Sequence, residues 1–177
     1  MNYRELDIKG AYLIKSDVFE DERGVFRRTY CVDSNTNAGI ETGISQGNLS
    51  INPNKATLRG FHYQEDPYGE AKTLTCVSGS IFNVIIDLRK DSETYEKVDS
   101  RVIKNDSGES IYVPAGCANA WITLEDNTII HYYMSNRYEP KAGKGIKYND
   151  KYFSINWPIK PKIISKKDLG YKDYKCQ

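Results

Sequence analysis

The sequence predicts an all-β domain in which many short strands form a sandwich or a barrel. Candidate strands follow one another at close, regular intervals along the chain. Clusters of Gly, Pro, Asn, Asp and Ser separate them, as turns between strands require. No stretch before residue 160 carries a sustained helical period of apolar residues.

The expected strands are the runs that these turn signals separate. In chain order they span residues 11–16, 24–31, 47–51, 58–63, 73–78, 80–88, 96–103, 110–113, 120–123 and 128–134. The turn signals lie at residues 21–24, 52–54, 78–79, 105–108, 114–116 and 125–127. After them comes a Lys-rich segment, residues 159–177, for which composition alone allows a short helix, a turn or a solvated tail.

Length, charge and cysteine usage narrow the class of protein. A chain of 177 residues suits one domain with a substantial core, so we expect a single domain over residues 1–177. The 25 basic residues nearly balance the 24 acidic ones, which argues against bulk electrostatic binding to nucleic acid or to a membrane. No apolar run is long enough to span a bilayer, and the N-terminus lacks a signal-peptide pattern. The four cysteines show no Cys-x-x-Cys spacing, so we expect reduced thiols in a cytoplasmic protein.

Two segments, residues 60–62 and 108–119, resemble the two sequence blocks of the cupin superfamily. That resemblance implies a double-stranded β-helix closed as a jelly-roll barrel, and we expect a short helical segment at the C-terminal end in addition. Metal-binding cupins need several His and carboxylate ligands facing the barrel interior. Gln64 and Asn119 stand where histidines are usual, which leaves His62 alone. One imidazole holds a metal poorly, and we expect no metal.

A closer resemblance covers nearly the whole chain. The following segments occur in this order: DERGVFRRTY, QGNLS, LRGFHYQ, AKTLTCVSGSIFNVIIDLRKDSETY, IYVPAGCANAWITL, YYMSNRYEP, GIKYND and INWP. Together they resemble the dTDP-4-dehydrorhamnose 3,5-epimerase family, which are metal-free cupins of bacterial deoxysugar pathways. The resemblance implies an enzyme that acts on a nucleotide-linked 4-keto sugar without a cofactor, for the synthesis of bacterial surface polysaccharides.

The reaction so implied removes and returns protons at C3 and C5, whose hydrogens the 4-keto group acidifies. By the resemblance, His62 is the base, and an imidazole ordinarily titrates close to neutral pH. Asp168 pairs with His62 and supports its protonated ring. Lys72 lies near the C4 oxygen, where negative charge develops, and Tyr132 returns a proton from the opposite face. A site that includes Asp168 requires residues 159–177 to fold back over the barrel mouth.

Each of these residues also has a structural explanation. A lone His in a strand is more often hydrogen-bonded for stability, a lysine at a strand start is commonly exposed, and one of 14 tyrosines is commonly a core or surface residue. Alternation along the strand offers a check on Tyr132. If Tyr132 points into the barrel, Ile130 and Met134 do so too. His131 and Tyr133 then point outward.

The segment from Arg59 to His62 does not fit simple alternation. The two side chains would face opposite sides of a regular strand, although the resemblance places both in the site. Gly60 between them permits a bulge or twist, so we expect an irregularity there. Arg59 is expected to bind the diphosphate, because a guanidinium suits phosphate oxygens. Tyr138 is expected to stack on the nucleotide base.

Four further residues complete the implied substrate site. Gln46 and Asn48 match polar positions of the same pocket. Arg23 and Phe26 belong to a block that reaches into the neighbouring subunit's site, so a homodimer with shared sites is implied. The structural alternatives are a charged turn residue for Arg23 and a core aromatic residue for Phe26.

Some residues depart from the family pattern. Asn119 stands at a position that usually carries His, and it is expected to hydrogen-bond the sugar without shuttling protons. Asn83 stands where Asp is common, and Arg27 and Arg28 replace an aromatic and acidic segment close to the base. These changes leave open a nucleotide other than dTDP, such as a GDP-linked 4-keto-6-deoxy-heptose, beside a dTDP-hexose. They also leave open epimerisation at C3 alone.

Two further functions remain as alternatives. A sugar-nucleotide 3,4-ketoisomerase is a related cupin, but Lys72 and Tyr132 in their present blocks favour the epimerase. A cupin that binds a sugar nucleotide without catalysis is the other. It would have no need for a base and an acid on opposite faces.

Overall fold

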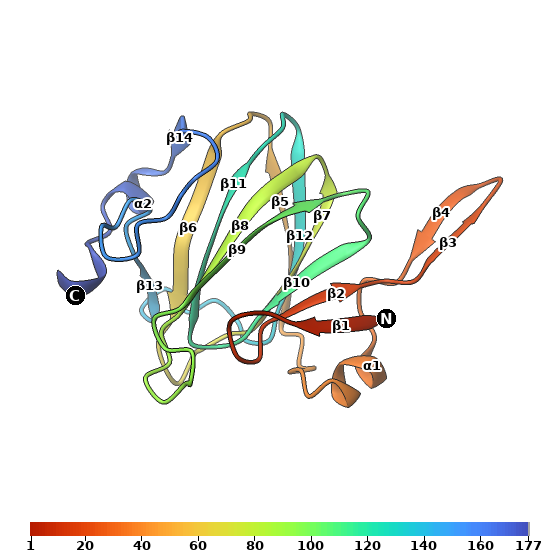
Figure 1. The fold of residues 1–177 in the computed structure, drawn as a ribbon, viewed down its shortest axis with the longest axis horizontal. Coiled ribbons are helices and arrows are strands. Elements are labelled where there is room, and N and C mark those ends of the chain that lie inside the picture. The colour runs from red at the N-terminus through yellow and green to blue at the C-terminus, as the bar shows by residue number, and fades with distance from the viewer. Residues whose placement is uncertain (177) are drawn as a thin grey trace.

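The chain folds into two sheets that face each other, with a separate two-stranded hairpin (Figure 1). This computed structural model describes residues 1–176, without the side chain of Cys176. Within this part of the chain, no helix is both long enough and apolar enough to cross a membrane.

The first sheet brings together strands that are distant in the sequence. Its members are β1 (Asn2–Glu5), β2 (Tyr12–Lys15), β5 (Gln46–Asn52), β7 (Lys72–Ser78), β10 (Glu109–Val113) and β12 (Thr128–Met134). They lie in the order β1-β2-β10-β7-β12-β5, and all neighbours are antiparallel. β5 therefore forms one edge of this sheet.

The second sheet carries the longest apolar strands. Its members are β6 (Thr57–Gln64), β8 (Ser80–Asp87), β9 (Val98–Lys104), β11 (Cys117–Thr123), β13 (Gly143–Gly145) and β14 (Ile163–Ile164). The order is β13-β6-β11-β8-β9, and β14 lies parallel to β6. All seven residues of β11 are buried, which places this strand at the centre of the fold.

The main core fills the space between the two sheets. Leu74 and Ile130 reach it from the first sheet, and Ile81 and Ile85 reach it from the second. Apolar side chains from two antiparallel sheets thus meet across one interior, as in a jelly roll or barrel. The all-β prediction is confirmed.

The C-terminal segment packs against the second sheet and is not a solvated tail. Ile163 of β14 pairs with Thr57 of β6. The helix α2 (Lys166–Leu169) follows, and its N-cap Ser165 accepts a hydrogen bond from the Asp168 N–H at 3.0 Å. Figure 1 shows this blue segment along the outer side of β6, with the short 3-10 helix η1 (Tyr174–Cys176) at its end.

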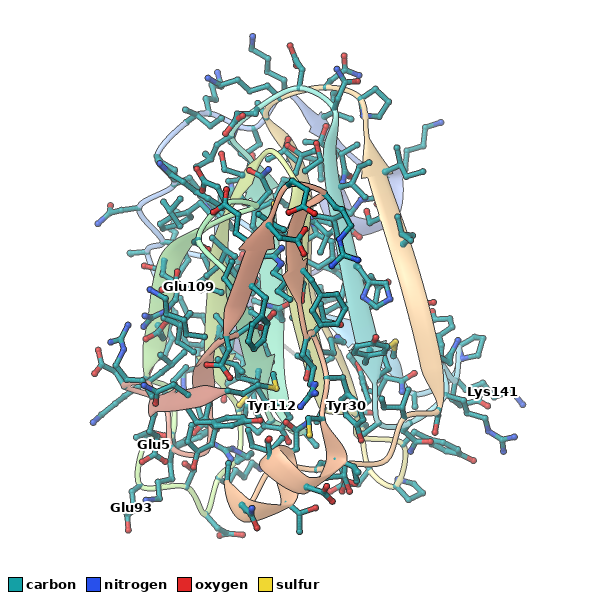
Figure 2. The ribbon with its side chains drawn as sticks, turned by 90° about the vertical axis from the view of Figure 1, so that its right-hand side faces the viewer. Glu5, Tyr30, Glu93, Glu109, Tyr112 and Lys141 are labelled. Atoms are coloured by element: carbon teal, nitrogen blue, oxygen red, sulfur yellow. The ribbon has the colours of Figure 1, made fainter. Side chains whose placement is uncertain are left out.

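A hairpin of β3 (Val18–Asp21) and β4 (Gly24–Arg27) projects away from the barrel (Figure 1). Figure 2 turns this hairpin toward the viewer, with Tyr30 near its foot. The helix α1 (Val32–Asn37) follows. The hairpin side chains Phe19 and Phe26 are mostly exposed, at 62% and 67%.

All ten expected strands are present, with changes at their ends. The strand expected at 24–31 stops at Arg27, and the strand expected from 96 begins at Val98, because Glu96 adopts a positive φ of 64°. β1, β3, β13, β14 and α1 were not predicted. α1 has the sequence VDSNTN, which carries no apolar stripe.

The cysteine side chains that the structure describes, Cys31, Cys76 and Cys117, are free thiols. Among residues 1–176, apart from the Cys176 side chain, no group of three His, Cys, Asp or Glu side chains is arranged to hold a metal ion.

Candidate active site

A cavity of about 610 Å³ lies between the two sheets. β5, β7 and β12 of the first sheet line it on one side, and β6 and β11 of the second sheet line it on the other. α2 and β14 complete its rim. A cavity of this size with a few polar groups is typical of a small-molecule site.

His62 and Asp168 form a hydrogen-bonded pair at this cavity. His62 Nε2 lies 2.9 Å from Asp168 Oδ1, and the Gly60 N–H donates to Asp168 Oδ2 at 3.2 Å. Burial acts to raise the pKa of the Asp168 carboxyl, but the hydrogen bond and charge of His62 outweigh it and hold the pKa below its ordinary value. With Nε2–H donated to Asp168, Nδ1 is the ring nitrogen that can accept a proton.

A bulge in β6 lets Arg59 and His62 line the same cavity. His62 pairs with Asn119 and Arg59 pairs with Trp121, so two residues of β6 oppose one residue of β11. The expected irregularity at Gly60 is confirmed. Gly60 has a φ of +114°, and a Cβ there would lie 2.6 Å from the Asn119 carbonyl oxygen. No other residue type fits without a shift of the backbone.

Lys72 begins β7 at the cavity wall and pairs with a carboxylate that the sequence reasoning missed. Its Nζ lies 2.8 Å from Glu70 Oε1, and both side chains are largely buried. Glu70 Oε2 has no hydrogen-bond partner among the described residues. The spacing of two residues was a usable signal, since residues i and i+2 of an extended segment share a face.

Tyr132 points into the cavity from β12, in agreement with the alternation argument. Ile130 and Met134 are buried on the same face, and Met134 also lines the cavity. His131 and Tyr133 lie together on the other face, with ring centroids 4.6 Å apart.

The environment of Tyr132 favours the protonated phenol. Burial is the largest influence and raises the pKa of Tyr132, the Arg59 charge lowers it, and Glu70 raises it, with a net shift upward. Tyr132 therefore retains its proton at neutral pH, as a proton donor must.

Asn119 lies next to His62 on the neighbouring strand and is 2% exposed. Its Nδ2 donates to Asn83 Oδ1 and to the Val84 carbonyl oxygen, both at 2.9 Å. Its Oδ1 has no partner among the described residues. Two of the departures from the family pattern, Asn83 and Asn119, thus form one neutral hydrogen-bonded pair.

The residues expected to bind the nucleotide lie around the same cavity. Arg59 donates from Nε to Asn52 Oδ1 at 2.9 Å, and Asn48 also lines the cavity. Gln46 Oε1 accepts the Tyr138 N–H at 2.5 Å. Lys167, which was not predicted, donates from Nζ to the Tyr138 hydroxyl at 3.2 Å. α2 therefore contacts both Tyr138 and His62.

Arg23 and Phe26 do not line this cavity. Arg23 pairs with Asp21 across the hairpin turn at 2.5 Å, and the two side chains are solvent-facing. Phe26 packs only against Phe19 among the ring contacts of the described residues, with centroids 6.5 Å apart. A core aromatic role for Phe26 is wrong.

Comparison with known proteins gives consistent matches. The family model described as dTDP-4-dehydrorhamnose 3,5-epimerase matches residues 5–175. A dTDP-4-dehydrorhamnose 3,5-epimerase of Sinorhizobium fredii is 32% identical over 95% of this chain and 87% of its own length. A dTDP-4-dehydrorhamnose 3-epimerase of Streptomyces niveus is 32% identical over 95% of this chain and 81% of its own.

Solved structures match over the whole fold. The dTDP-4-dehydrorhamnose 3,5-epimerase of Bacillus anthracis, solved with TDP and PPi bound, superposes with a TM-score of 0.92 at 31% identity. The match covers 96% of this chain and 97% of that one. The predicted resemblance and the cupin jelly-roll fold are confirmed.

Proposed function

The chain belongs to the dTDP-4-dehydrorhamnose 3,5-epimerase family of sugar-nucleotide isomerases, and on that premise we propose that His62 and Tyr132 move protons beside the 4-keto group of a nucleotide-linked 6-deoxy sugar. One observation carries this proposal. His62 comes from β6 of the second sheet and Tyr132 from β12 of the first, so a potential base and a potential acid face one cavity from opposite walls.

The proposed reaction begins with proton transfer from C3 or C5 to His62 Nδ1. Asp168 stabilises the imidazolium that forms, because its carboxylate already binds Nε2 at 2.9 Å. The electron pair of the broken C–H bond moves into the enolate, whose oxygen lies near Lys72. Tyr132 then gives its proton to the opposite face of the same carbon. His62 releases the abstracted proton to solvent, and Tyr132 takes a proton from solvent, which restores both groups. A sugar of inverted configuration results.

The nucleotide end of the substrate is proposed to lie toward Arg59 and Tyr138. Arg59 supplies a positive charge for the diphosphate, and the Tyr138 ring supplies a stacking surface for the base. Gln46 holds the Tyr138 backbone, and Asn48 lines the same wall. The TDP and PPi bound to the Bacillus anthracis relative support a nucleotide ligand here.

The proposal includes two substrate series, dTDP-linked hexoses and GDP-linked heptoses. Arg27 donates to the Cys76 carbonyl oxygen at 3.3 Å, so its guanidinium is held at the foot of the hairpin. A second candidate activity, inversion of C3 alone, is favoured by Asn119, whose amide cannot carry a proton in the way that His does. The 3-epimerase of Streptomyces niveus is a relative with that named activity.

A homodimer with shared sites is part of the proposal, in a cytoplasmic enzyme that serves surface polysaccharide synthesis. The exposed apolar side chains Phe19, Val25 and Phe26 of the hairpin suit an interface between subunits. Leu49 and Ile51, on the edge strand β5, are also exposed. An edge strand with such side chains is a surface that a second subunit commonly covers.

Solvent deuterium incorporation tests the function directly. The protein is incubated in D₂O with dTDP- and GDP-linked 4-keto-6-deoxy hexoses and heptoses, and label at C3 and C5 is followed by NMR and mass spectrometry. Label at both carbons in one series is expected for a 3,5-epimerase, and label at C3 alone supports the C3 epimerase. Binding without label would contradict the proposal and leave a non-catalytic sugar-nucleotide-binding protein. A carbonyl that moves from C4 to C3 would identify a ketoisomerase.

A further inference from the structure

Trp121 lines the cavity and carries a buried hydrogen-bond donor that no described residue uses. The residue is 7% exposed and lines the cavity, and its indole Nε1 is buried without a partner in the described part of the chain. A buried donor that makes no hydrogen bond destabilises the fold. Such a group in a cavity is a mark of a ligand that supplies the missing acceptor.

An unused acceptor lies two residues away on the same strand. Asn119 Oδ1 is also buried without a partner among the described residues. The Asn119 amide cannot turn freely, because its Nδ2 donates to Asn83 and Val84. The oxygen therefore remains the free end. Residues i and i+2 of a strand share a face, with Cα atoms about 7 Å apart.

We propose that Trp121 Nε1 and Asn119 Oδ1 together bind one hydroxyl group of the sugar ring, which accepts a hydrogen bond from the indole and donates one to the amide. This inference rests on the proposed function and adds to it the group that this part of the site recognises. A hydroxyl is the sugar substituent that both accepts and donates. A keto oxygen or a phosphate oxygen could use only the indole.

The position of Trp121 places this hydroxyl next to the reacting carbons. The indole packs edge-on against Tyr132, with ring centroids 6.1 Å apart at 60°. Asn119 is the direct pairing partner of His62. A hydroxyl held by Trp121 and Asn119 thus fixes the ring between the proposed base and the proposed acid, so the pair is a determinant of which sugar is accepted.

The indole signals of the unsubstituted protein test the contact. The sequence has two tryptophans, so a ¹⁵N-labelled sample gives two indole N–H signals. We expect dTDP-6-deoxyglucose or its GDP counterpart, which lack the keto group and cannot react, to shift the Trp121 signal downfield. dTDP or GDP alone should leave it in place. The Trp157 signal should not move, because its N–H donates to the Tyr148 carbonyl oxygen at 2.9 Å, outside the cavity.

Matched Trp→Phe variants supply the kinetic test. Trp121→Phe should raise KM for the sugar nucleotide about tenfold through the lost hydrogen bond, and the Kd of the nucleoside diphosphate should stay constant. Trp157→Phe makes the same substitution outside the cavity and should keep the wild-type KM. Asn119→Leu should add little to Trp121→Phe, because both changes release the same hydroxyl.

The outcomes separate this inference from the proposed function. Deuterium exchange with an unmoved Trp121 signal would overturn the hydroxyl site and leave the epimerase intact. A moved signal without exchange would support the hydroxyl site and contradict the epimerase. An equal shift with the nucleoside diphosphate alone would also overturn the hydroxyl site. Should Trp121→Phe fail to fold, the signals of the unsubstituted protein decide.

Discussion

His62 and Asp168 lie 106 residues apart in the chain, yet His62 Nε2 and Asp168 Oδ1 are 2.9 Å apart in the structure. The carboxylate is 4% exposed and also accepts the Gly60 N–H. This contact orients the imidazole, and when Nε2–H is donated to Asp168, Nδ1 is the ring nitrogen that can accept a proton. The pairing joins β6 of the barrel to α2 at the end of the chain.

Removal of either member of this pair should abolish proton exchange and spare binding. We expect His62→Asn to lower deuterium incorporation more than about 100-fold, because the base is lost. Asp168→Asn should lower it by a similar order, because the amide no longer supports the imidazolium. Isothermal titration with the nucleoside diphosphate should give the wild-type Kd for both. His131→Asn alters the other histidine, on the outer face of β12, and undiminished exchange is expected there.

Tyr132→Phe should separate proton removal from inversion. The base remains, so deuterium should still enter the substrate, but product with inverted configuration should fall about 100-fold or more without the acid. Rates of label entry and of inversion are measured on one sample by NMR. Tyr133→Phe is the matched control, since Tyr133 packs against His131 on the opposite face. Equal loss of both rates in Tyr132→Phe would remove its assigned role.

Gly60→Ala should destabilise the fold by more than backbone strain alone. The added Cβ would meet the Asn119 oxygen at 2.6 Å and the Ala120 Cβ at 2.7 Å. Gly39→Ala is the control, because Gly39 has a φ of +69° with nothing within 4 Å of its Cβ position. We expect a loss of about 1 kcal/mol for Gly39→Ala and at least about 3 kcal/mol for Gly60→Ala in urea unfolding. Equal losses would show that the β6 backbone shifts at the bulge and makes room for the added Cβ.

Asp87 should make the fold sensitive to acid. Burial acts to raise the pKa of this carboxyl, but hydrogen bonds from Arg89, Ser92 and Thr94 outweigh it and hold the pKa well below the ordinary range. The folded state thus binds this proton more weakly than the unfolded state. Its contribution to stability is complete above the unfolded-state pKa of about 3.9 and is lost as the pH falls below that value.

The corresponding variant is Asp87→Asn. We expect a loss of about 3 kcal/mol at neutral pH, because Arg89 is left without its charged partner. The difference in unfolding free energy between the wild type and the variant should shrink in acid. Urea unfolding at pH 7 and at about pH 3 measures both values. A difference that stays constant with pH would show that Asp87 is not the group responsible.

Subunit mixing tests whether the hairpin completes the neighbouring site. His62→Asn and Arg23→Ala should each be nearly inactive alone. In a mixed dimer, the subunit with Arg23→Ala keeps His62 and receives an intact hairpin from its partner. Random mixing at equal amounts should then restore about a quarter of the sites. Restored activity requires sites shared between subunits, and an inactive mixture would place the hairpin's role within its own protomer.

The long strands could be predicted because their own residues and the turns beside them are typical of β-strands. β8 and β12 combine β-branched runs with turns at both ends, and their observed bounds agree with the predicted ones to within one residue. β3 has four exposed residues and β14 has only two residues. Such strands form because a neighbouring strand offers hydrogen bonds. The residues of the strand itself therefore do not predict it.

In the site, too, some features could be predicted from the sequence and others depend on contacts between distant residues. His62, Lys72, Tyr132 and Asp168 followed from the resemblance, and the structure gathers all four around one cavity. The alternation argument also placed Tyr132 and His131 on opposite faces of β12. Contacts between side chains that are distant in the sequence could not be predicted in this way. The link from Lys167 to Tyr138 and the unpaired indole donor of Trp121 depend on side-chain positions that no motif records.

The placement of Asp168 on α2 has a consequence for how the protein is made. Every strand of the two sheets except β14 is synthesised before residue 146, so most of the barrel can leave the ribosome while the carboxylate is still untranslated. The pair of His62 and Asp168 can form only after residue 168 has been translated, so the proposed base gains its carboxylate partner after the barrel strands have been made.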